Sequence, residues 1–230
     1  MTTRETINRI YERLLAAYGP QHWWPGETPF EVMVGAVLTQ NTNWKNVEKA
    51  IANLKSRDLL SPEALYRLSP AELAQLIRPA GYYNIKAKRL GNLVRFIVDE
   101  FAGDLSRMRR LSVGELRERL LSVSGVGRET ADSIALYALK KPAFVVDAYT
   151  ARVLLRHGLI DETADYDEIK ETFESNLPVD VQMFNEYHGL IVTVGKLHCK
   201  KHAVCEGCPL DVLFESPRSR PKDGLDGFDD

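Results

Sequence analysis

Two glycines separated by one apolar residue interrupt a helical pattern in the segment LLSVSGVGRETADSIALYAL, residues 121–140. Gly125, Val126 and Gly127 are predicted to form the turn before a helix that begins near Arg128. The free N–H groups and the positive dipole end of that helix would suit an anion, and in DNA the anion is a phosphate. A plain tight turn between packed helices is the alternative, because short glycine motifs are common.

One acidic residue stands out after the hairpin. Asp147 follows the apolar run AFVV and precedes another helical pattern. An aspartate at a helix start usually caps the helix. In a ligand site the same carboxylate can stabilise a developing positive charge and activate a water molecule.

All three tryptophans of the chain lie in residues 21–44, QHWWPGETPFEVMVGAVLTQNTNW. Trp23 and Trp24 are adjacent, Pro25 follows them, and Trp44 closes the segment. An aromatic face attracts a cationic ligand by about 0.5–2 kcal/mol per contact. Taken singly, each tryptophan could equally be a core residue.

The elements that must position these residues are predicted to be helices almost throughout. Thr2 and Glu5 have the spacing of a capping box ahead of apolar residues that recur at helical intervals. Two short helices each open with Ser-Pro, and AFVV is the only strand candidate. We expect an all-α fold, with a disordered tail over residues 215–230 because that segment lacks periodicity.

The composition of the 230-residue chain is that of an ordinary globular protein with a net charge of −2. Contacts with nucleic acid would therefore have to come from local donors, since the molecule has no general basic field. The N-terminus has no apolar signal region and no apolar run is long enough to cross a bilayer. We expect a cytoplasmic protein that does not bind membranes.

Hairpin, helix, apolar stretch and Asp147, in this order, resemble the helix-hairpin-helix DNA glycosylases. The segment FEVMVGAVLTQNT resembles the part of endonuclease III that carries a lesion-site glutamine, here Gln40. GYYNIKAKRL resembles the loop that wedges into the duplex, with Tyr82 at the wedge position. The resemblance implies that Gly125, Val126, Gly127 and Arg128 contact the DNA backbone.

The fold implied by this resemblance has two helical lobes with the DNA cleft between them. One lobe would span residues 23–140 and contain the hairpin. The other would combine residues 1–22 with residues 141–214, including the cysteine loop. The resemblance implies a monomer that acts on damaged double-stranded DNA.

The chain departs from endonuclease III directly after the hairpin. The bifunctional relatives carry a lysine in a pattern like GVGRKTA, whereas this chain reads GVGRETA and has Glu129 there. A lysine amine can form a Schiff base with the sugar, and a carboxylate cannot. We therefore expect a monofunctional glycosylase that uses water, with Asp147 stabilising the oxocarbenium-like sugar.

The tryptophan segment is similar to the 3-methyladenine DNA glycosylase III branch of the endonuclease III-like enzymes. In that branch two tryptophans, a proline and a phenylalanine surround the base. The matching positions are Trp23, Trp24, Pro25 and Trp44. An alkylated purine is therefore the expected substrate, and since such a base is already cationic, it needs no second acid to leave.

The three cysteines, Cys199, Cys205 and Cys208, are an odd and clustered set, which indicates metal ligation rather than disulfides. They resemble the family's iron–sulfur loop, C-x6-C-x2-C-x5-C, but the first spacing is one residue short and Phe214 replaces the fourth cysteine. A [4Fe–4S] cluster normally takes four thiolates. Three alternatives stay open: a cluster with a fourth ligand from His198, His202, Asp211 or water, a zinc ion on three cysteines and one histidine, and a metal-free loop. Of these we expect a bound or labile cluster.

Two other functions remain as alternatives. A bifunctional glycosylase and abasic-site lyase for oxidised pyrimidines is the enzyme alternative, and borohydride trapping would detect it. A non-catalytic helix-hairpin-helix DNA-binding protein is the second. Asp147 argues against the latter, because phosphate binding does not need a carboxylate.

Overall fold

The computed structural model describes residues 2–213, and they contain helices and no strand. The all-α prediction is confirmed. The predicted tail over residues 215–230 and the Phe214 position lie outside the described residues. The described residues form two compact units, one built from residues 2–24 together with residues 142–213, the other from Pro25–Lys141.

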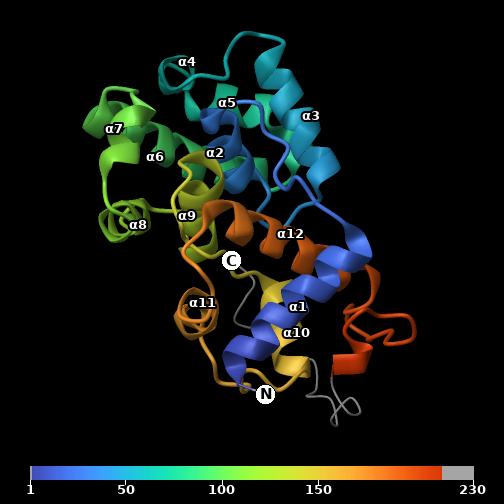
Figure 1. Ribbon diagram of the computed structural model, residues 1–230. Coiled ribbons are helices and arrows are strands. Elements are labelled where there is room, and N and C mark those ends of the chain that lie inside the picture. The colour runs from blue at the N-terminus through green and yellow to red at the C-terminus, as the bar shows by residue number, and fades with distance from the viewer. Residues whose placement is uncertain (1, 214–230) are drawn as a thin grey trace. The chain divides into compact units, whose positions relative to one another are not determined.

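The first unit joins the N-terminal helix to the last part of the described chain. Its helices, labelled in Figure 1, are α1 (Thr3–Tyr18), α10 (Ala148–Arg156), α11 (Tyr166–Glu174), α12 (Val181–Leu197) and the short 3-10 helix η3 (Asp211–Leu213). Helix α12 is the centre of this unit because both α1 and α10 pack against it.

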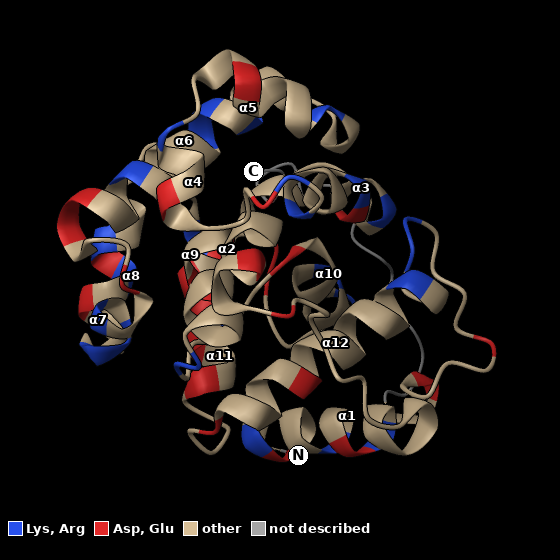
Figure 2. Cartoon of the chain, turned by 90° about the horizontal axis from the view of Figure 1, so that it is seen from above, with Lys and Arg blue, Asp and Glu red and all other residues tan. Residues whose placement is uncertain are grey.

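Helix α1 shows how the sequence builds this unit. Thr2 and Glu5 form the predicted capping box, in which the Thr2 hydroxyl accepts from the Glu5 N–H and the Glu5 carboxylate accepts from the Thr2 N–H. Ile7, Ile10 and Leu14 are fully buried at helical spacing. Charged residues of both signs follow the solvent side of the helix (Figure 2). The buried stripe therefore faces α12.

The second unit is built around a long helix. Its elements are α2 (Pro29–Leu38), α3 (Trp44–Lys55), α4 (Pro62–Tyr66), α5 (Pro70–Leu76), η1 (Arg78–Ala80), α6 (Tyr83–Phe101), α7 (Leu105–Arg110), α8 (Val113–Leu121), α9 (Arg128–Ser133) and the π-helical turn η2 (Ile134–Ala138). Helices α2, α4, α5 and α7 pack against α6. Helix α2 is buried at nearly every position, which fits its apolar sequence.

The two short helices expected after Ser-Pro pairs are present. Ser61 and Ser69 cap α4 and α5, and a proline occupies the first helical position in each. Among the described residues, no helix is both long and apolar enough to span a bilayer.

Candidate active site

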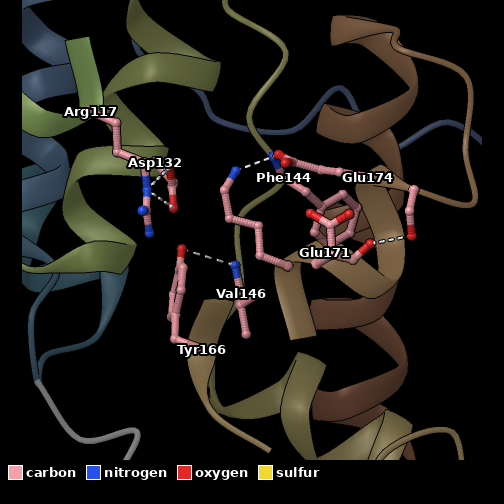
Figure 3. A network of polar contacts seen from close by, with 9 residues as sticks. Arg117, Asp132, Phe144, Val146, Tyr166, Glu171 and Glu174 are labelled. Atoms are coloured by element: carbon pink, nitrogen blue, oxygen red, sulfur yellow. Dashed lines mark hydrogen bonds and ion pairs between the residues drawn. The ribbon is translucent and has the colours of Figure 1, made fainter. Parts of the chain in front are cut away.

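The segment that leads to Asp147 is extended and buried, but it is not a strand. Side chains of α11 satisfy its backbone (Figure 3): the Glu174 carboxylate accepts from the Phe144 N–H at 2.7 Å, and the Tyr166 hydroxyl accepts from the Val146 N–H at 3.4 Å. The Phe144 ring stacks on Phe173 with centroids 3.9 Å apart. AFVV, the only strand candidate, is therefore an extended connection. Its contacts with α11 set its position and that of Asp147, which follows it.

Asp147 is the N-cap of α10. Its Oδ1 accepts hydrogen bonds from the Thr150 N–H at 2.8 Å and from the Thr150 hydroxyl at 2.9 Å. Its Oδ2 lies 3.6 Å from His188 Nε2. The capping interpretation is thus confirmed, and one carboxylate oxygen has a second neighbour.

The protonation state of Asp147 follows from opposing effects. Burial raises the pKa of Asp147, but the His188 ring and the hydrogen bonds from Thr150 outweigh burial and hold that pKa below its usual range. The carboxylate is therefore ionised at neutral pH. A largely desolvated anion of this kind can stabilise a positive charge that develops beside it.

His188 is a site residue that the sequence interpretation missed. It lies in α12 and is 4% exposed, between the buried Tyr187 and Gly189. Its ring meets the edge of Trp23, with centroids 6.0 Å apart. A histidine on an apolar helix more often belongs to the core, so the only sequence signal was its place in the apolar run YHGLIV.

Helix α12 also fixes the segment that carries Trp23. The Glu186 carboxylate accepts from the backbone N–H groups of Gln21 and His22 at 2.6 and 2.9 Å. The Thr193 hydroxyl donates to the Gln21 side-chain oxygen at 2.7 Å. Gly189 lies between Glu186 and Thr193 in the sequence. A Cβ at Gly189 would lie 2.9 Å from the Trp23 Cβ, so glycine permits the close approach of α12 and the Trp23 segment.

The two adjacent tryptophans are half-buried. Lys196 Nζ lies 5.7 Å from the centroid of the Trp23 ring, within cation–π range. In the described part of the chain, the buried Trp23 indole N–H has no hydrogen-bond acceptor. Trp24 has a left-handed backbone with φ of 71°, which is strained for a bulky residue. Strained residues cluster at ligand sites, and an orphaned donor can meet a ligand.

The four residues of the predicted base pocket divide between the two units. Trp23 and Trp24 belong to the first unit, whereas Pro25 and Trp44 belong to the second. Pro25 is exposed. Trp44 is half-buried at the start of α3, and its indole N–H donates to Glu48 at 2.9 Å. The common pocket stays a prediction.

The hairpin predicted at residues 125–127 joins α8 to α9. Gly125 has φ of 97°, and a Cβ there would lie 2.8 Å from the Cβ of Arg89 on α6. Val126 is 5% exposed and anchors the turn in the core. Gly127 is the N-cap of α9, and Arg128 is the exposed first residue of that helix. The glycines thus allow both the turn and its close packing on α6.

A partly buried ion pair joins the two helices of the hairpin. Arg117 of α8 donates from Nε to both carboxylate oxygens of Asp132 of α9, at 3.1 and 3.2 Å (Figure 3). Asp132 is fully buried. Such a pair fixes the relative orientation of two helices, because each charge is costly to leave without the other.

Gln40 and Tyr82 differ in their surroundings. The Gln40 side chain donates to the Thr130 hydroxyl at 2.9 Å and accepts from Arg89, so the hairpin and α6 hold it. Tyr82 is 74% exposed and has a left-handed backbone with φ of 42°. The structure therefore brings Gln40 to the hairpin and leaves the Tyr82 ring open to solvent. Their roles on DNA stay predictions.

Comparison with known proteins shows to which family a chain with this hairpin and this aspartate belongs. The family model described as HhH-GPD superfamily base excision DNA repair protein matches residues 34–179.

The chain belongs to the HhH-GPD superfamily.

A protein of Methanocaldococcus jannaschii that is provisionally named a DNA repair glycosylase is 54% identical over 90% of this chain and 94% of its own length. The endonuclease III of Thermotoga maritima is 33% identical over 84% of this chain and 86% of its own length.

Solved structures agree with this membership. The 3-methyladenine DNA glycosylase of H. pylori, bound to 1,N6-ethenoadenine, superposes with a TM-score of 0.72 and is 31% identical; the match covers 86% of this chain and 98% of that one. An endonuclease III trapped as a covalent intermediate with DNA gives a TM-score of 0.79 at 26% identity, covering 93% and 96% of the two chains. This HhH-GPD protein is a DNA glycosylase of base excision repair, and its relatives bind DNA.

Glu129 is a half-buried residue in the first turn of α9. The position where the resemblance puts a lyase lysine therefore holds a carboxylate. Lys140, the first lysine after it in the sequence, is exposed and has a left-handed backbone beyond η2.

The cysteine loop does not fit an iron–sulfur cluster. The chain has three cysteines, whereas such a cluster normally takes four thiolates. Within residues 2–213, no group of three or more histidine, cysteine or acidic side chains is placed to hold a metal ion. Cys199 is buried, and its sulfur accepts a hydrogen bond from Arg156 at 3.3 Å. The described residues thus lack the four-ligand set of the cluster that we expected, and we propose a metal-free loop in its place.

Arginines take part in organising this loop. Arg156 donates to the carbonyls of Lys200 and Lys201 at 2.6 and 2.7 Å, and Arg152 donates to the carbonyl of Cys199 at 3.2 Å. Both arginines belong to α10, so the helix that Asp147 caps also holds the loop. Guanidinium groups that meet several carbonyls can fix a loop without metal.

Proposed function

We propose that this protein is a monofunctional DNA glycosylase that hydrolyses the bond between a flipped, alkylated purine and its deoxyribose. The observation that carries the proposal is the ionised, half-buried carboxylate of Asp147, fixed by Thr150 and facing His188 with its second oxygen. A carboxylate so held needs no reorganisation when positive charge develops beside it.

The proposed reaction is a hydrolysis. The bond between the base nitrogen and the sugar C1′ breaks, and the base leaves with the electron pair. The sugar becomes oxocarbenium-like, and the negative charge of Asp147 stabilises it. Water then adds to C1′ and gives its proton to the carboxylate, which acts as a general base.

The expected substrate class rests on the aromatic residues and on a relative. The H. pylori 3-methyladenine DNA glycosylase binds 1,N6-ethenoadenine, a modified purine. Here Trp23 is a half-buried indole whose buried N–H has no acceptor in the described chain. Stacking on an indole suits any purine, and a cationic one gains cation–π attraction as well. Flipping the base costs a few kcal/mol, which the stacking offsets.

The absence of a lyase step is inferred from Glu129. A carboxylate cannot form the Schiff base through which a lysine breaks the DNA strand. The product would be an intact abasic site and a free base.

The test is incubation of the purified protein with methylated duplex DNA, followed by chromatography of the released bases. We expect free 3-methyladenine without strand breaks. Release of oxidised pyrimidines with strand cleavage and a borohydride-trapped adduct would instead support the bifunctional alternative. Tight DNA binding with no base released from either substrate would support a non-catalytic binding protein.

A further inference from the structure

Lys86 is a buried lysine that the proposed reaction does not use. It lies in the first turns of α6, is 2% exposed, and points its ammonium at two backbone carbonyls. Lys86 Nζ donates to the Leu38 carbonyl at 2.9 Å and to the Ala80 carbonyl at 2.8 Å. No carboxylate contacts this ammonium in the described part of the chain.

The two carbonyls belong to segments that are distant in the sequence. Leu38 is the last residue of α2, two residues before Gln40, and Ala80 ends η1, two residues before Tyr82. Helix ends leave carbonyls without intrahelical partners, so one ammonium here satisfies two helix ends at once. Lys86 thereby links the starts of the two loops that carry the predicted gap-filling and wedge residues, Gln40 and Tyr82.

Two further residues of α6 extend this connection. Arg89, three residues after Lys86, donates to the Gln40 side-chain oxygen. Asn92, another three residues on, donates to the Ser124 carbonyl of the hairpin at 2.8 Å. Residues three apart are neighbours on a helix surface. Helix α6 therefore contacts each of the three segments predicted to touch DNA.

Burying an ammonium is costly for stability. Burial, with a smaller contribution from the nearby Arg89, lowers the pKa of Lys86 to about 8. Burying an ammonium whose only partners are two neutral carbonyls costs more free energy than satisfying those carbonyls with a neutral donor. We propose that Lys86 is a positioning residue that holds the Gln40 and Tyr82 loops at a fixed separation, so that both side chains enter the duplex together. This inference rests on the proposed function.

The test compares binding of two duplexes, one with a tetrahydrofuran abasic-site analogue and one undamaged, by fluorescence anisotropy below the melting transition. Lys86→Met removes the donors, and we expect the preference for the abasic duplex to fall on the order of 10- to 100-fold, as for other misplacements of a positioned group. Lys86→Arg, which keeps charged donors, should restore part of that preference.

Two control variants separate positioning from other effects. Lys88→Met removes an exposed charge from the same helix, and Lys170→Met removes a buried lysine from the other unit. Neither should change the preference, although Lys170→Met should lower the melting temperature. In a Tyr82→Ala background, Lys86→Met should reduce the preference for the abasic duplex by a smaller factor than in the parent, because the effects of interacting residues are not additive.

Several results would overturn the inference. These are an unchanged preference in Lys86→Met, the same loss in Lys170→Met, or full additivity with Tyr82→Ala. If Lys86→Met does not fold, Lys86→Gln serves in its place, because its amide still donates but reaches less far. Failure of the parent to release alkylated bases would overturn the proposed substrate and leave this comparison intact, because it measures binding alone.

Discussion

At the scale of single residues, the two carboxylate oxygens of Asp147 have different surroundings. One oxygen caps α10 through Thr150, and the other faces His188. The capping role could be predicted from the sequence, because an aspartate before a helical pattern is a strong local signal. The His188 contact could not, since it depends on how α12 packs against α10.

Trp24 offers a test of the pocket at this scale. We expect Trp24→Ala to slow excision of 3-methyladenine by an amount that corresponds to roughly 1–3 kcal/mol of lost base–aromatic stacking free energy. Binding to an abasic-site analogue should persist. Trp24→Phe, which keeps an aromatic face, should lose less. Excision assays are run beside thermal melts. A Trp24→Ala protein that melts lower yet excises at the parental rate while folded would show that Trp24 is only a core residue.

Glu129 tests the hydrolytic assignment. We expect no covalent adduct when the parent protein and abasic DNA are treated with borohydride, since a carboxylate forms no Schiff base. An authentic glycosylase/lyase treated in parallel is the positive control. A trapped parent adduct, identified on gels by its retarded mobility, would mean that another amine takes the role of the missing lysine.

At the scale of elements, local signals predicted the helices well. The capping box of α1 and the Ser-Pro starts of α4 and α5 appear where the sequence puts them. The AFVV segment was the exception, because the partners of its backbone N–H groups are side chains of α11. The left-handed backbone of Trp24 was equally unpredictable, since bulky residues rarely adopt it.

The hairpin gives a prediction about an element. Gly125→Ala should destabilise the protein by roughly 1–3 kcal/mol, because alanine is strained at positive φ and its Cβ would meet Arg89. Gly114→Ala is the matched control, since nothing lies within 4 Å of a Cβ there. It should be neutral or slightly stabilising. Denaturant unfolding of both variants checks this, and equal stability of the two would contradict the packing described for the hairpin.

At the scale of the whole molecule, the described residues begin and end in the same unit, and the described part of the other unit is continuous in sequence. The resemblance to helix-hairpin-helix glycosylases gave the family and the fold class. It was less informative for the cysteine loop, which lacks one cysteine of the family pattern. The hydrogen bonds that Arg152 and Arg156 make to this loop are visible only in the three-dimensional structure.

Metal removal is the corresponding test. We expect the purified protein to lack the visible absorbance of an iron–sulfur cluster and to contain neither iron nor zinc by elemental analysis after anaerobic preparation. A chelator should leave its melting temperature unchanged, whereas Arg156→Ala should lower it through loss of the hydrogen bonds to the loop. Stoichiometric iron, or unfolding on chelation, would contradict the metal-free interpretation.

The most direct test of the account is the single-turnover rate of 3-methyladenine release by the parent and by Asp147→Asn. Asparagine caps a helix about as well as aspartate, so α10 should persist while the negative charge is lost. We predict parental affinity for damaged DNA and a rate lower by a factor on the order of 10²–10³ or more. A rate within a few-fold of the parent would remove Asp147 from the mechanism and contradict the proposed reaction.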